Sequence, residues 1–166
     1  NRTVIIGDSA GSGTMTTNAS GSIPSYADGT VAVGYGAYYA LTTGASNVAI
    51  GYESMYSDTD GVSNVVIGYQ AGKQLTGSTR NTIIGKGALS APSTAADNLA
   101  DCVVIGYEAF KGNASNTTTG ANGTVAIGSN ALFALTTGGY NTAIGYKALE
   151  DNQTGAYNTA VGYNSL

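Results

Sequence analysis

Histidine is absent from this chain of 166 residues, and only one cysteine, Cys102, is present. Without histidine, neither a Ser-His-Asp nor a Cys-His catalytic set can form. A single cysteine also excludes a disulfide within the chain. The sequence shows no cluster of convergent acid, base and nucleophile. We therefore expect a protein that has no catalytic activity and needs no cofactor.

Charged residues are also scarce, at 10% of the chain, and the formal net charge is −4. A chain of this kind lacks the basic surface that binds the phosphates of nucleic acids. No apolar run reaches the roughly 18 residues of a membrane-spanning helix, so no membrane insertion is expected. The sequence starts at Asn1 with no recognisable signal peptide, and we expect it to be a segment of a longer protein.

Glycine, by contrast, is abundant, with 25 residues, or about twice its usual share. Many of these glycines belong to a phrase that recurs nine times, as in Asn47–Met55 and Asn141–Leu149. Five of the eight intervals between its glycines are equal, and the other three are longer. A fixed period of about 17 residues predicts a solenoid, in which each unit buries its apolar face against its neighbours. The repeat glycines are Gly7, Gly34, Gly51, Gly68, Gly85, Gly106, Gly128, Gly145 and Gly162.

The three residues before each glycine, at positions −3, −2 and −1, alternate in a way that predicts a β-strand. Positions −3 and −1 are β-branched throughout, and position −2 is alanine or β-branched, never polar. A half-buried strand would carry polar residues on one face, so both faces of this strand are expected to be buried away from water. We expect position −2 to pack against other copies of the chain, because small alanines allow a close approach. This predicted interface comprises Ala32, Ala49, Val66, Ile83, Val104, Ala126, Ala143 and Ala160.

The positions around the strand carry further structural information. The glycine indicates a bend that needs a positive φ or a close approach of two backbones. Position −4 is asparagine in five units, which suits a turn before a strand or a ladder of stacked amides. A coil of this period has room for two short strands and two turns. Parallel strands stack about 4.8 Å apart, so nine coils predict a rod about 40 Å tall.

The phrase resembles the head repeat of YadA-type trimeric autotransporter adhesins, which also occurs in phage tail and head fibres. The residues that carry the resemblance are Asn47–Gly51, Asn64–Gly68, Asn141–Gly145 and Asn158–Gly162. It implies an all-β fold, a left-handed parallel β-roll of about nine coils over residues 1–166, with three rolls packed about a threefold axis. The adhesin repeat is commonly shorter than the repeat of this chain, and the Gly-Tyr variant looks closer to the phage fibres.

The same resemblance implies a structural and attachment function. We expect a trimeric segment of a phage-type tail or virion fibre, and the alternative is the head of a bacterial adhesin that binds host matrix or cell surface. Its partners would be two further copies of the chain and a glycan or protein receptor on the host cell. Its place would be extracellular, on a virion or a bacterial surface.

A more remote alternative is a hexapeptide-type β-helix acyltransferase. Ile105–Phe110 fits the hexapeptide rule of those enzymes. Their coils, however, carry the hexapeptide three times, whereas it occurs once per unit here. They also use a histidine base, which this chain lacks. Both differences weigh against this interpretation.

Three insertions lengthen the period, and all fall between the fourth residue after a glycine and the next strand. They are Gly11–Gly29, Ser90–Asp101 and Lys111–Gly123. Because they share one phase of the repeat, they should project from one edge of the rod. They are either receptor-facing loops or tolerated bulges. If they are receptor loops, removing them should leave the roll folded and abolish binding to the host surface.

A tyrosine follows the glycine in six units and should form a column along one edge. It is either a stacking platform for sugars or, as we expect, a set of rings that stack on one another. The candidate binding residues are Tyr35, Tyr52, Tyr69, Tyr107, Tyr146 and Tyr163.

Four aspartates and the cysteine are the remaining candidates for chemistry. Asp58 and Asp60, with Asp97 and Asp101, could suggest calcium, but neither pair has the spacing of an EF-hand. We expect these aspartates to lie in solvated loops. Cys102 occupies position −4, which is usually asparagine, and is expected to be a buried free thiol.

Overall fold

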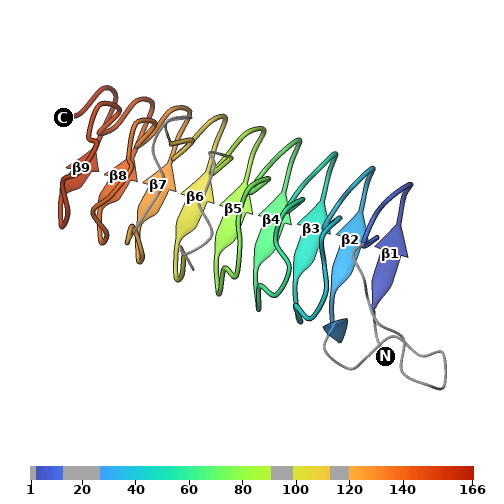
Figure 1. The fold of residues 1–166 in the computed structure, drawn as a ribbon. Coiled ribbons are helices and arrows are strands. Elements are labelled where there is room, and N and C mark those ends of the chain that lie inside the picture. The colour runs from blue at the N-terminus through green and yellow to red at the C-terminus, as the bar shows by residue number, and fades with distance from the viewer. Residues whose placement is uncertain (1–2, 13–26, 91–98, 113–119) are drawn as a thin grey trace, which may run out of the picture.

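Nine short parallel strands, one from each repeat, form a single sheet in chain order in this computed structural model (Figure 1). The structure describes residues 3–12, 27–90, 99–112 and 120–166. Each strand consists of the three residues before a repeat glycine. The strands are β1 (Val4–Ile6), β2 (Val31–Val33), β3 (Val48–Ile50), β4 (Val65–Ile67), β5 (Thr82–Ile84), β6 (Val103–Ile105), β7 (Val125–Ile127), β8 (Thr142–Ile144) and β9 (Thr159–Val161). The predicted all-β parallel solenoid is confirmed, while its hand stays a prediction.

The strands pair in perfect register along the whole sheet. Val48 lies opposite Val65, and Ile50 lies opposite Ile67. The same positions pair where the repeat is longer, between β1 and β2, β5 and β6, and β6 and β7. The three insertions therefore leave the stacking of the strands unchanged. Most of the insertions themselves lies outside the described residues.

The rest of the described coils consists mainly of turns and bends, with the isolated parallel bridges Val62–Thr79 and Thr79–Ala100 where a second strand could have formed. Non-glycine residues with positive φ recur there, such as Glu53 (φ 50°) and Met55 (φ 53°), two and four residues after Gly51. This left-handed backbone points N–H groups at the neighbouring coil: the N–H of Met55 donates to the carbonyl of Ala71 at 2.9 Å. Hydrogen bonding between coils thus continues through turns and isolated bridges, and the described coils have one strand each rather than the two for which there is room.

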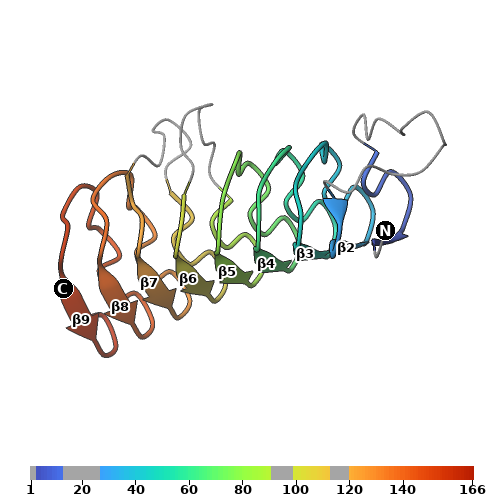
Figure 2. The same ribbon diagram turned by 90° about the horizontal axis from the view of Figure 1, so that it is seen from below.

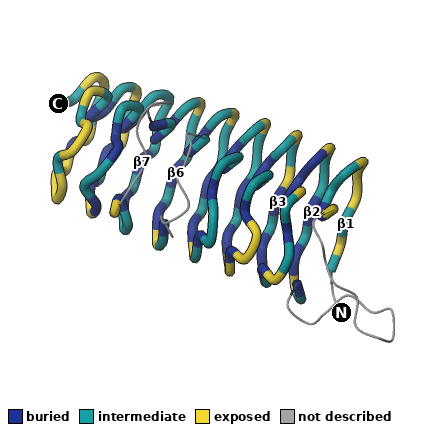
Figure 3. The backbone as a smooth tube through the Cα atoms, viewed as in Figure 1, coloured by how far each residue is buried: buried dark blue, intermediate teal, exposed yellow. Residues whose placement is uncertain are grey.

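The solenoid interior is built from the strand's middle residue and from side chains of the turns (Figure 3). The fourth residue after the glycine is the largest contributor, as with Met55 and Phe110, both fully buried. In some coils, the sizes of two side chains are complementary: that of the middle strand residue and that of the fourth residue after the glycine. A Cβ on Gly72 would lie 3.2 Å from Val66, whereas the coil with the smaller Ala49 places Met55 there. In the Gly72 coil, Leu75 would also lie 2.7 Å from the same Cβ, so Val66 and Leu75 fill the space that Met55 fills one coil earlier.

This burial corrects the predicted interface between copies. The middle strand residues point into the coil of their own chain, where a second chain cannot reach them. Their exposed fractions are zero except for Ala160, at 7%. The residues placed inside are Ala32, Ala49, Val66, Ile83, Val104, Ala126, Ala143 and Ala160. The surface that another copy could contact is the opposite face of the strands.

The repeat glycines form a column in which adjacent backbones nearly touch. Gly68 has φ 137°, and a Cβ built on it would lie 2.6 Å from the carbonyl oxygen of Gly85 in the next coil. Both expected reasons for glycine, a positive φ and a close backbone approach, are confirmed at this position. Any other residue would have to push two coils apart.

We predict that Gly68→Ala destabilises the solenoid by about 3 kcal/mol or more, because it adds both backbone strain and a clash with the next coil. Thermal unfolding followed by circular dichroism measures the change. Gly120→Ala is the matched control, since its φ is also positive, at 66°, but nothing lies within 4 Å of its Cβ. Equal losses for the two variants would contradict the close-approach argument.

Candidate functional site

The nine strands lie along one side of the solenoid (Figure 2). The residues on the outward face of this sheet form a continuous apolar surface. It is formed by the first and third residues of each strand, which we call the outer face. Fifteen of its eighteen residues are valine or isoleucine, and three are threonine. Each is half-buried or exposed, with Ile6 at 59% and Ile50 at 37%. The outer face comprises Val4, Ile6, Val31, Val33, Val48, Ile50, Val65, Ile67, Thr82, Ile84, Val103, Ile105, Val125, Ile127, Thr142, Ile144, Thr159 and Val161.

Amphipathic and polar groups border this face on both sides. The tyrosine column follows the glycines along one border. On the other border, at the fifth position before the glycine, the Arg80–Asp101 ion pair joins two coils at 2.7 Å. Both side chains are more than half exposed, so the pair contributes little to stability. An apolar centre with a polar rim is the arrangement found at protein–protein interfaces.

Five of the six tyrosines after the glycines stack on one another, as expected, whereas Tyr107 has the Lys86 ammonium 5.7 Å from its ring centre instead. The Tyr35–Tyr52 and Tyr52–Tyr69 ring centres are each 5.2 Å apart, with nearly parallel planes, and Tyr146 stacks on Tyr163 at the same distance. Within these stacks the rings cover one another's faces and leave mainly edges and hydroxyls to solvent. Stacking is thus the structural role of these rings, while binding of a ligand by the column stays a prediction.

Two further tyrosine stacks were not predicted from the sequence. Tyr39 stacks on Tyr56 at 4.7 Å, and Tyr140 stacks on Tyr157 at 5.3 Å. The two members of each pair lie one repeat period apart, so the period was the signal that could have found them. Stacking between coils is thus a general use of tyrosine in this solenoid.

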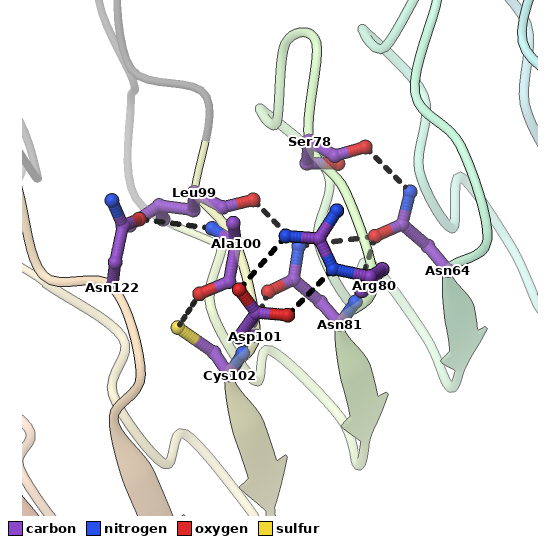
Figure 4. A network of polar contacts seen from close by, with 9 residues as sticks. All are labelled: Asn64, Ser78, Arg80, Asn81, Leu99, Ala100, Asp101, Cys102 and Asn122. Atoms are coloured by element: carbon purple, nitrogen blue, oxygen red, sulfur yellow. Dashed lines mark hydrogen bonds and ion pairs between the residues drawn. The ribbon is translucent and has the colours of Figure 1, made fainter. Parts of the chain in front are cut away.

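A ladder of asparagine side chains runs inside the coil, beside the start of the strands (Figure 4). The side-chain amide of Asn64 donates to the Asn47 side-chain oxygen at 3.0 Å and to the Ser78 carbonyl at 2.7 Å. Asn81 donates in the same way to Asn64, at 3.0 Å. These residues are buried, and the bonds satisfy polar groups that would otherwise be costly. The expected amide ladder is confirmed.

Cys102 takes the place of an asparagine in this ladder (Figure 4). Its backbone N–H donates to the Asn81 side-chain oxygen at 3.0 Å, but its thiol makes only weak contacts of 3.4 Å with the carbonyls of Ala100 and Ala121. Burial raises the pKa of the Cys102 thiol. The thiolate is the reactive form of cysteine, so this group is unreactive. The predicted buried free thiol is confirmed.

Asp58 does not lie in a solvated loop, contrary to expectation. It is fully buried, and its carboxylate accepts hydrogen bonds from the N–H of Gly61 at 2.7 Å and the hydroxyl of Ser78 at 2.6 Å. Burial raises the pKa of the Asp58 carboxyl, although these bonds oppose the rise. Asp58 is thus a structural link between adjacent coils. Asp60 and Asp101 are exposed as expected, and Asp97 lies outside the described residues.

Two further features are absent from the described residues. These residues contain no group of three or more histidine, cysteine, aspartate or glutamate side chains that could hold a metal ion. Over the same residues, no helix has the length and apolar character needed to cross a membrane.

No known protein family, curated protein or solved structure matches this chain. The likeness to adhesin and fibre repeats therefore rests on the repeated phrase, together with the parallel solenoid that the structure shows.

We predict that Cys102→Asn stabilises the protein by about 1 kcal/mol, because the new amide would extend the ladder with two hydrogen bonds. Its acceptors would be the Asn81 side-chain oxygen and the Ala121 carbonyl. Differential scanning calorimetry measures the rise in Tm, and Cys102→Ala serves as the control that removes the thiol without adding an amide. If the asparagine variant is less stable than the alanine variant, the amide ladder cannot be extended to position 102.

Proposed function

We propose that the protein is a trimeric, extracellular structural and attachment element, most closely like a segment of a phage-type tail or virion fibre. It has no catalytic role in this proposal. The observation that carries it is the outer face of the sheet, an apolar surface that runs from β1 to β9 without a charged residue. Exposed apolar surfaces of this continuity mark sites of association.

The occupant of the outer face is best explained as another copy of the chain. The face repeats two β-branched side chains on every strand, at the spacing of paired strands, about 4.8 Å. A partner that contacts it along its full length needs a surface of the same period. A second solenoid provides one, because its own outer face has identical rows. Removing this apolar area from water contributes about 25 cal/mol per Å².

The number of copies comes from the resemblance to trimeric adhesin and fibre repeats. In such a trimer the three outer faces would meet about a common axis. The residues in contact would then be those of the outer face, in place of the middle strand residues first expected. The polar residues and tyrosines bordering the face would form the rim of each interface.

Attachment is assigned to the three insertions, 11–29, 90–101 and 111–123. They fall at one phase of the repeat, and the register of the strands on either side is the same as elsewhere. A threefold assembly would present each of them three times, so that weak contacts with a host glycan or protein receptor gain from avidity. The rod itself would act as a rigid spacer.

The head of a bacterial adhesin is the second candidate, favoured by the Asn-Val-Ala-Ile-Gly phrase at Asn47–Gly51. Its predicted assembly is the same, and only its place on a bacterial rather than a viral surface differs. We prefer the fibre because of the longer, Gly-Tyr form of the repeat. The sequence on either side of this segment would distinguish the two.

We predict that the protein has three times its chain mass of 16.5 kDa in solution, and that Ile67→Lys with Ile84→Lys reduces it to a folded monomer. Both side chains lie on the outer face of β4 and β5, where burying two ammonium groups in each copy would be strongly unfavourable. Sedimentation equilibrium measures the mass, and circular dichroism checks the fold.

The matched control for this pair is Ser129→Lys, which adds a lysine in the tyrosine column, where Lys86 already stands. It should leave the mass unchanged. A wild-type monomer at micromolar concentration would contradict the assembly, and a dimer would contradict its threefold symmetry.

A second prediction concerns the insertions. Shortening the three long intervals to the common repeat period should preserve the sheet and the mass, because the flanking strands already pair in register. It should abolish attachment to the host surface, measured by binding of labelled protein to host cells. Full binding by the shortened protein would assign attachment to another part of the rod.

A further inference from the structure

Among the basic side chains that the structure describes, Lys86 alone has no carboxylate partner in its own chain. The ammonium group of Lys86 lies instead 5.8 Å from the centre of the Tyr69 ring and 5.7 Å from that of Tyr107. Its side chain is exposed, so its charge is accessible to a group outside the chain. The other four described basic residues form the ion pairs Lys73–Glu53, Arg80–Asp101, Lys111–Glu108 and Lys147–Glu150.

Lys86 also belongs to the few charged residues along the outer face and its borders. Each coil presents four residues there: the fifth, third and first before the glycine, and the one after it. These positions are described in every coil from β2 to β9, and the charged residues among them are Arg80, Lys86 and Asp101. All three lie on the two adjacent coils that contain β5 and β6. An otherwise uncharged surface thus carries its charges at one level of the rod.

The strands keep these charges apart within one chain. Lys86 follows β5 on the tyrosine border, whereas the Arg80–Asp101 pair precedes β5 and β6 on the opposite border (Figure 4). Between parallel copies the same borders come together. Rotation about an axis parallel to the rod brings the tyrosine border of one copy beside the opposite border of the next, as in any closed head-to-tail ring. A copy running in the reverse direction would instead set like border against like border.

We propose that Lys86 forms an ion pair with Asp101 of a neighbouring copy, and that this pair orients the copies parallel to one another. The inference rests on the proposed association of outer faces, although not on the number of copies. The Asp101 carboxylate accepts hydrogen bonds from Arg80 Nε at 2.7 Å and Nη2 at 2.9 Å. An ionised carboxylate has about four acceptor positions, so a lysine can bind without displacing the arginine.

The neutral coils on either side make this contact selective for position. On the border of Asp101, the flanking positions are Ser46 and Ser63 before Arg80, and Gly123 and Tyr140 after Asp101. A copy displaced by two coils would therefore place Lys86 opposite a neutral residue. The apolar rows alone would tolerate such sliding, because each coil resembles the next. A polar group at one level of an apolar interface is an established means of fixing its register.

Zero-length cross-linking tests the pair directly. A carbodiimide joins an amine to a carboxylate that it touches, forming an amide while the reagent takes up the water that is lost. The treated wild type should run at multiples of the chain mass on a denaturing gel, and peptide mass spectrometry should identify the Lys86–Asp101 link. Lys86→Gln should abolish the multimer bands. Lys147→Gln is the matched control and should keep them, because the carboxylate partner of Lys147 lies in its own chain.

A second measurement gives the contribution of the pair to assembly. Lys86→Glu should raise the dissociation constant of the assembly about tenfold or more in sedimentation equilibrium, because it sets like charges against each other. Circular dichroism should be unchanged, since the side chain is exposed. The intrachain link between Lys111 and Glu108 should form in every variant, which shows that the reagent is active.

The outcomes separate this inference from the assembly itself. If the wild type has the mass of an assembly but no Lys86–Asp101 link forms, or if Lys86→Gln is cross-linked as well as the wild type, the pair is overturned and the assembly stands. A link from Lys86 to Asp8, which follows β1 on the same border, would show reversed copies and also overturn the pair. A wild-type monomer would overturn both.

Discussion

Adjacent coils pass each other at the repeat glycines so closely that no Cβ fits between them. A Cβ on Gly51 would lie 2.5 Å from the carbonyl oxygen of Gly68, and the same near contact recurs from coil to coil. This contact can form only where two glycines meet, so it holds every strand in the same register. The residue at each position of the repeat then stacks directly on the residues at the same position in the adjacent coils. The tyrosine stacks, the amide ladder and the outer face are all consequences of that alignment.

The stacking of equivalent residues from successive repeats explains why a coil with so short a strand is stable. A three-residue strand offers few ladder hydrogen bonds, but turn residues such as Tyr38 and Met55 donate N–H bonds to the next coil as well. The side-chain NH2 group of the buried Asn64 donates two hydrogen bonds, one to the side-chain oxygen of the neighbouring asparagine and one to a turn carbonyl. Because each unit obtains these bonds from its neighbours, stability belongs to the stack rather than to a single coil.

The sequence predicted the features that follow from the repeat period, such as the parallel strands and their stacking. It failed where one residue pattern is compatible with two arrangements of the chain. Position −2 alternates with β-branched neighbours whichever face is inside, so the pattern alone could not tell the interior from the outer face. The large residue at Met55, which fills the coil opposite small Ala49, was the signal that decides it. Left-handed turns at Glu53 and Met55 were hidden because these residues rarely adopt positive φ. Asp58 was misjudged because its partner, Ser78, lies twenty residues away.

A strictly repeating surface has little capacity to discriminate between ligands, since every coil would present the same groups. The uniform rows of the outer face suit a partner of the same period and favour self-association. Differences between coils lie where the repeat is broken: at the insertions, and at single positions such as Lys86 and Ser129. Lys86 brings an ammonium group within 6 Å of two tyrosine rings, whereas Ser129 places a short polar side chain in the same column. In a solenoid held in register by its glycines, such departures from the repeat are the positions at which one coil presents a different surface from the next.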